Sequence, residues 1–258
     1  MSNYAQALLY YNKALSSLKE SIDPDNTRKF AAILNNIGLC YINLVDYSSA
    51  LSYLEQALKI GEDCTDTDDL DKAAAYNNIG VCYYRMKNDS LSLQYYLSAL
   101  KIRKKVLGNN HPLIAESYSN IGDSYRRQKR FEAALSYVKQ ALLIEKNILG
   151  EEHPNIAITY VNIGGCYTDM CDFDSAIYYF NKALSIFKTK LGLDHYAVAT
   201  IYANMAFCYE KKDLNDLALK CYMDALDILR KRLGADHKVT KKCEKRLEEL
   251  KARLLESN

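Results

Sequence analysis

The stretch Asn120-Ile121-Gly122-Asp123-Ser124-Tyr125 decides the fold, because related copies of it occur at four other places in the chain. Those copies begin at Asn36, Asn78, Asn162 and Asn204. Subtracting consecutive asparagine numbers (36, 78, 120, 162 and 204) gives 42 each time. A fixed period of roughly this length is the signature of a protein built from stacked repeats, and it outranks any local motif.

Each repeat divides into two segments with apolar residues at spacings of three and four, which predicts a pair of helices. The junctions recur as well, and the first reads Leu107-Gly108-Asn109-Asn110-His111-Pro112. We expect Gly108 to close the preceding helix in the left-handed conformation, and His111 and Pro112 to begin the next. Asp46 can cap the helix that follows it. The predicted helices are 3–20, 28–43, 47–61, 69–86, 89–106, 111–127, 131–148, 153–170, 173–190, 195–211, 214–232 and 237–255.

The period predicts one continuous array over residues 1–258. It consists of an N-terminal half-repeat helix (1–22), five full repeats (28–62, 69–106, 111–148, 153–190 and 195–232) and a charged C-terminal capping helix (236–256). Residues 22–27 are expected to form a loop. The N-terminal segment matches a second helix whose first helix is missing, so it is either a cap or part of a longer array.

The columns of the repeat explain its packing. Gly122 lets the partner helix approach closely, and we expect the small side chain of Ala134 to fill the space opposite. Cys40, Cys82, Cys166 and Cys208 share one column. Equivalent positions in stacked repeats lie too far apart for disulfides, so we interpret these cysteines as small buried residues in a reducing, cytoplasmic environment.

The pattern of Tyr118, Ile121-Gly122, Tyr125, Ala134 and Ala141 resembles the tetratricopeptide repeat. The period and the Leu-Gly-x-x-His-Pro junction resemble its kinesin-light-chain class. The resemblance implies an all-α fold, a right-handed superhelical solenoid of antiparallel helix pairs, with the first helices lining a concave groove. It also implies a protein-interaction scaffold or adaptor in which the repeated asparagine binds ligand backbone. The alternative is that this asparagine bonds the neighbouring repeat.

No constellation for catalysis appears, and we expect no enzyme, cofactor or metal. The four histidines are 42 residues apart at helix starts, so they cannot converge on one ion. The acidic loop 62–71 lacks the glycine and terminal glutamate of a calcium loop. A net charge of +2 without a basic stripe argues against nucleic acid, and no segment has the length and hydropathy of a membrane helix or a secretory signal.

The expected partner is a protein or peptide, and arginines in the middle of the groove favour an acidic or C-terminal carboxylate segment. A solvated helix end is the competing interpretation of these arginines. A second hypothesis makes the array a sensor, docking or oligomerisation segment of a larger protein. The predicted groove residues are Asn35, Asn36, Asn77, Asn78, Arg85, Glu116, Asn120, Asp123, Arg126, Arg127, Asn162, Asn204 and Lys211.

Overall fold

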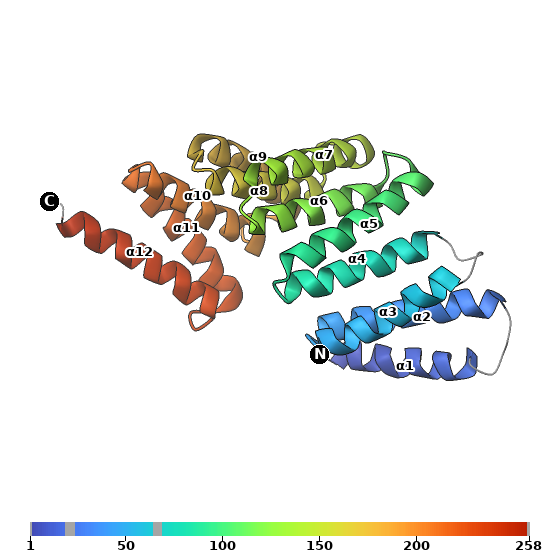
Figure 1. Cartoon of the computed structure of the whole chain (residues 1–258). Helices are drawn as coiled ribbons and strands as arrows, with labels where there is room; N and C mark the ends of the chain where they lie inside the picture. The colour runs from blue at the N-terminus through green and yellow to red at the C-terminus, as the bar shows by residue number, and fades with distance from the viewer. Residues whose placement is uncertain (1, 19–23, 64–68, 257–258) are drawn as a thin grey trace. The chain divides into compact units, whose positions relative to one another are not determined.

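The computed structural model describes residues 2–18, 24–63 and 69–256, and over these ranges the chain forms helices and no strands (Figure 1). The helices are α1 (Ser2–Leu18), α2 (Pro24–Asn43), α3 (Tyr47–Asp63), α4 (Asp69–Arg85), α5 (Asp89–Leu107), α6 (Pro112–Arg127), α7 (Phe131–Leu149), α8 (Pro154–Asp169), α9 (Phe173–Leu191), α10 (Tyr196–Lys211), α11 (Asn215–Leu233) and α12 (Lys238–Glu256). Within each repeat a short turn joins a first helix to the second helix that packs against it, as in α4 with α5 and α10 with α11. The all-α architecture predicted from the period is confirmed.

The contacts divide the chain into two compact units, residues 1–137 and 138–258, and the division falls inside α7. In the first unit the first helices are α2, α4 and α6. In the second unit they are α8 and α10, and α12 packs against α11 in the same order. The single array over residues 1–258 stays a prediction.

Two predicted loops are partly helical. Residues 24–27 belong to α2, which begins at Pro24 because proline suits the first helical turn; residues 22 and 23 lie outside the described ranges. In the acidic segment, α3 extends to Asp63 and α4 begins at Asp69, while Asp66 and Asp68 lie outside the described ranges. The acidic side chains of Asp69 and Asp71 lie in the first turn of α4, where the helix dipole favours negative charge.

The turns follow the repeat. Inside each pair, the residue at one equivalent turn position has a positive φ although it is not glycine: Val45, Lys87, Lys129, Cys171 and Asp213. Between pairs, Gly108 combines φ 74° with ψ −160°, and Gly192 and Gly234 are similarly extended. A positive φ combined with an extended ψ is open essentially only to glycine. These glycines close the preceding helices as predicted, but their ψ differs from the value near +47° of the predicted left-handed conformation.

In three repeats the glycine of the first helix faces a large side chain and not only the small residue expected opposite it. A Cβ atom added to Gly80 would lie 2.7 Å from the Tyr96 ring, and one on Gly164 would lie 2.6 Å from Phe180. Leu54 occupies the same place opposite Gly38. At these three glycines the large side chain stands four residues after the small residue expected there, which is Ala50, Ser92 or Ala176. Ala134, the residue expected opposite Gly122, is fully buried.

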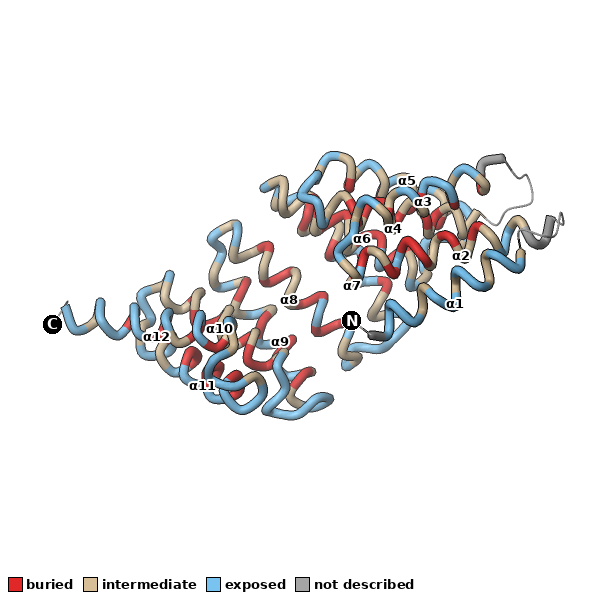
Figure 2. The backbone as a smooth tube through the Cα atoms, turned by 90° about the horizontal axis from the view of Figure 1, so that it is seen from below, coloured by how far each residue is buried: buried red, intermediate tan, exposed pale blue. Residues whose placement is uncertain are grey.

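In four repeats a pair of stacked tyrosines joins the first helix to the second helix of the same repeat. Tyr41 stacks on Tyr53, Tyr83 on Tyr95, Tyr125 on Tyr137 and Tyr167 on Tyr179, with ring centroids 5.4–5.5 Å apart. Buried alanines and the cysteine column complete the core, shown red in Figure 2. Cys40, Cys82, Cys166 and Cys208 are buried as predicted, and burial raises the pKa of the Cys82 thiol to about 12.

Candidate interaction surface of the first helices

The predicted site lies on the first helices, and its central feature is the asparagine column. In the first unit two of its three members bond the neighbouring repeat. Asn78 Nδ2 donates to Asn35 Oδ1 and Asn120 Nδ2 donates to Asn77 Oδ1, each at 3.0 Å. For Asn78 and Asn120, the structure therefore supports the interpretation that the side chain links repeats. Asn36 makes no side-chain hydrogen bond to a described residue and lines a pocket of about 240 Å³ with Asn35.

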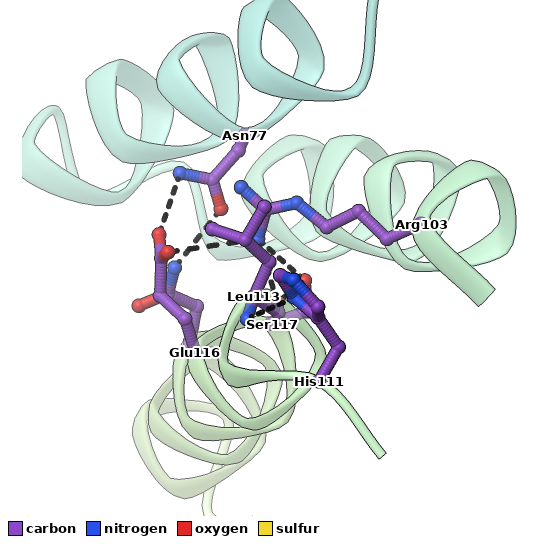
Figure 3. A network of polar contacts seen from close by, with 7 residues as sticks. Asn77, Arg103, His111, Leu113, Glu116 and Ser117 are labelled. Atoms are coloured by element: carbon purple, nitrogen blue, oxygen red, sulfur yellow. Dashed lines mark hydrogen bonds and ion pairs between the residues drawn. The ribbon is translucent and has the colours of Figure 1, made fainter. Parts of the chain in front are cut away.

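The asparagine links continue into a partly buried polar network that the sequence did not suggest (Figure 3). Asn77 Nδ2 donates to Glu116 Oε1 at 3.2 Å, and Glu116 lies 3.8 Å from Arg103. Arg103 is only 4% exposed, and its Nη1 donates to the Leu113 carbonyl oxygen and to Ser117 Oγ at 2.9 and 2.7 Å. Burial lowers the pKa of the Arg103 guanidinium, and Glu116 acts in the opposite direction. The network therefore ties α4, α5 and α6 together.

Arg127 is engaged within the fold, which removes its guanidinium from the predicted ligand site. Its Nε lies 3.0 Å from Asp89 Oδ1, it donates to the Tyr84 carbonyl oxygen, and its guanidinium lies 4.3 Å from the centroid of the Tyr84 ring. Asp89 Oδ1 is buried and receives no well-aligned hydrogen bond, so charge attraction holds this pair.

The other charged residues predicted in the middle of the array differ in exposure. Arg85 is exposed and makes no hydrogen bond or ion pair with a described residue. Arg126 is half-buried and already has an interaction partner. Burial raises the pKa of the Asp123 carboxyl group, while the charge of Arg126 lowers it. Arg85 is therefore the most accessible of the three arginines.

In the second unit, the predicted residues Asn162, Asn204 and Lys211 lie on α8 and α10. Neither asparagine side chain hydrogen-bonds a described residue, in contrast to Asn78 and Asn120. Lys211 is exposed, with its ammonium nitrogen 5.6 Å from the centroid of the Phe207 ring.

Asn204 and Phe207 line a pocket of about 280 Å³ between α10, α11 and α12. Apolar walls come from Tyr196 and Val239, and the cationic side chains of Lys242 and Arg246 complete the lining. Both cations are exposed, and Arg246 lies 4.0 Å from Glu249 of its own helix. The pocket therefore combines aromatic walls, an amide with free hydrogen-bonding capacity and two accessible positive charges.

The sequence contains a signal for this pocket in the register of α12. Arg246 stands 42 residues after Asn204, so it occupies the asparagine column on α12. Interpreting α12 only as a cap left Lys242 and Arg246 out of the predicted site. The period alone could have placed them on the same face as Asn204.

The histidines have a structural role. Nδ1 of His111, His153, His195 and His237 accepts a hydrogen bond from the backbone N–H two residues further on, at 3.2–3.3 Å. Within the described ranges, no group of three or more His, Cys, Asp or Glu side chains is placed to hold a metal ion. No helix in those ranges has the length and apolar character needed to span a bilayer.

Comparisons with known proteins support the repeat architecture. Family models described as tetratricopeptide repeat match residues 29–105, 71–144 and 113–189, and a second such model matches residues 199–230. A search of curated proteins gives no significant match.

Solved structures resemble the fold at low sequence identity. BtubC (BKLC) from P. vanneervenii is 19% identical, with a TM-score of 0.78 over 91% of this chain and 93% of that chain. Kinesin light chain-like repeats from Podosopora anserina are 16% identical, with a TM-score of 0.66 over 78% and 95%. The apo form of RapI is 16% identical, with a TM-score of 0.74 over 98% and 72%. At these identities the similarity concerns the fold alone.

Proposed function

Since the chain belongs to the tetratricopeptide repeat family, we propose that it is a non-catalytic protein-interaction scaffold that binds an extended segment of a partner. The observation that carries the proposal is the pocket between α10, α11 and α12. Its volume of about 280 Å³ lies near the lower end of the roughly 300–1,000 Å³ typical of small-molecule sites, which suits one or two side chains of a peptide.

The lining defines the chemistry of the partner. The rings of Tyr196 and Phe207 would contact an aromatic or large aliphatic side chain. Lys242 and Arg246 would attract carboxylates on either side of it, and the Asn204 amide can both donate to and accept from peptide backbone. The proposed ligand is an acidic segment with a central apolar residue.

Fluorescence anisotropy with labelled short peptides tests this proposal. The peptides carry Phe, Leu or Ala at the centre, flanked by Asp and Glu or by the neutral Asn and Gln. We expect saturable binding of the acidic Phe and Leu peptides, weaker binding of the Ala peptide and little binding of the neutral series. Equal binding of the acidic and neutral peptides would overturn the electrostatic part of the proposal.

Matched variants locate the site. The double variant Lys242→Glu with Arg246→Glu should weaken binding about tenfold or more, which corresponds to about 1.4 kcal/mol. Lys241→Glu with Lys245→Glu makes the same charge change at exposed positions of α12 outside the pocket lining and should have a small effect. If both pairs weaken binding equally, the effect is long-range attraction and the pocket is not the site.

The first helices of residues 1–137 provide a second candidate binding site, because Arg85 is exposed there and forms no ion pair with a described residue. Arg85→Glu tests it without disturbing the pair between Arg127 and Asp89. If Arg85→Glu weakens the acidic peptide while the α12 double variant does not, the binding site lies in the first unit.

A further inference from the structure

Helix α1 exposes an apolar face at positions that are covered in the other repeats. Ala7 and Ala14 of α1 match Ala50 and Ala57 of α3, an offset of 43 residues. The same offset matches Tyr10 with Tyr53 and Tyr11 with Leu54. Helix α1 therefore has the side-chain pattern of a second helix.

Burial differs sharply between α1 and its equivalents. Ala50 and Leu54 have no exposed area, whereas Ala7 and Tyr11 are half-buried. Tyr10 is 70% exposed, whereas Tyr53, Tyr95, Tyr137 and Tyr179 are all half-buried. No residue of α1 from Asn3 to Leu18 is buried, as its tan and pale blue tube shows in Figure 2.

The other repeats show what covers these positions. In α5, Tyr96 lies against Gly80 of α4, and the neighbouring Tyr95 stacks on Tyr83 of α4 at 5.5 Å. The Tyr10-Tyr11 pair of α1 stands where α5 has Tyr95-Tyr96. Among the described residues, α1 packs on α2 and no helix occupies the place that α4 takes on α5. The missing partner is therefore a first helix with glycine opposite Tyr11 and tyrosine opposite Tyr10.

Helix α12 does not have the chemistry to be that partner in another copy of the chain. The glycine and tyrosine columns of the first helices fall on Glu248 and Lys251 in α12. A glutamate side chain cannot leave the space that Tyr11 needs, and a lysine provides no ring to stack on Tyr10. Head-to-tail assembly through α1 and α12 is disfavoured for this reason.

We propose that the exposed face of α1 docks an amphipathic helix that is not contained in residues 1–258. This helix carries a small residue, glycine or alanine, and a tyrosine three residues later, as Gly80 and Tyr83 do in α4. Docking would stack that tyrosine on Tyr10 and cover Ala7, Tyr11 and Ala14. The interaction uses a different surface from the proposed peptide pocket, so the two proposals can fail separately.

The probe is a labelled peptide with the sequence of residues 69–86, in which Cys82→Ser prevents oxidation. We expect saturable binding to the full chain. The peptide variant Gly80→Leu with Tyr83→Ala should lose at least tenfold in affinity. In the chain, Tyr10→Asp should cause a similar loss, while Asn12→Asp, which adds the same charge at an exposed position equivalent to Glu55, should not.

Three results would overturn the proposal. They are absence of binding at the highest soluble concentration, equal binding of the two peptides, and equal binding by the Tyr10→Asp chain. Analytical sedimentation of the chain alone tests the other possible occupant of this face, which is a second copy of the chain. If the chain self-associates, Tyr10→Asp abolishes that association and the peptide does not bind, the face is an interface between two copies instead.

Discussion

At the scale of single residues, neighbours decide whether a repeated side chain is available to a partner. Arg85 and Arg127 occupy the same position of the repeat, but the residue found 38 positions earlier in the sequence differs between them. Arg127 meets Asp89, whereas the equivalent residue for Arg85 is Tyr47, which carries no charge. Asn120 meets the amide of Asn77, whereas Asn204 would meet Val161, which has no acceptor. The column predicts the position of each side chain, and the preceding repeat determines its partner.

The contact between Gly80 and Tyr96 gives a stability prediction. Alanine is the better helix former by about 1 kcal/mol, yet Gly80→Ala should destabilise the protein by about 1–3 kcal/mol because its Cβ atom would overlap the Tyr96 ring. Urea denaturation followed by circular dichroism measures the change. Tyr96→Val in the Gly80→Ala background should recover part of the loss. An unchanged or higher stability of Gly80→Ala would show that the contact is not tight.

The turn residue Val45 gives a prediction of the opposite sign. It has φ 66° and is 67% exposed, so its β-branched side chain contributes little packing while its backbone conformation is unfavourable. Val45→Asn should raise the free energy of unfolding by about 0.5–1 kcal/mol, since asparagine tolerates positive φ. Thermal denaturation checks this, and Asp213→Asn, at an equivalent turn with an already tolerant residue, should change little. A loss of stability in Val45→Asn would contradict the strain argument.

At the scale of helices, the Arg103 network joins three elements through one buried cation. Arg103 emerges from α5 and donates to α6, and Glu116 of α6 accepts from Asn77 of α4. Hydrogen bonds of this kind contribute most when their partners would otherwise be left buried and unsatisfied. The network therefore fixes how α6 packs on α4 and α5.

Removing this cation should loosen those helices. Arg103→Met should lower the free energy of unfolding by about 1–3 kcal/mol, because the Ser117 hydroxyl and the Leu113 carbonyl lose a buried donor. The control Lys105→Met breaks only the exposed ion pair with Asp69 and should cost about 0.5 kcal/mol or less. Denaturant unfolding compares the two. If the two variants lose the same free energy of unfolding, the network stabilises the protein no more than an exposed ion pair does.

At the scale of the whole molecule, much of the fold follows from the sequence because the period and apolar spacing repeat in every pair. Each described helix lies within a few residues of its predicted bounds. The exceptions have local causes, such as Pro24, which begins α2 earlier, and Gly108, which uses an extended ψ. The candidate site was less predictable. The buried environment of Arg103 and the pairing of Arg127 depend on contacts between repeats, whereas Arg246 could have been found from its register alone.

The most direct test of the proposed function is hydrogen–deuterium exchange of the full chain with and without the acidic Phe peptide. The pocket predicts slower exchange in two segments, residues 196–207 of α10 and 239–246 of α12, with little change in α2, α4 and α6. The slowing should disappear in the Lys242→Glu, Arg246→Glu variant. Slower exchange confined to the first helices of residues 1–137, or none in α10 and α12 at saturating peptide, would contradict the proposed site.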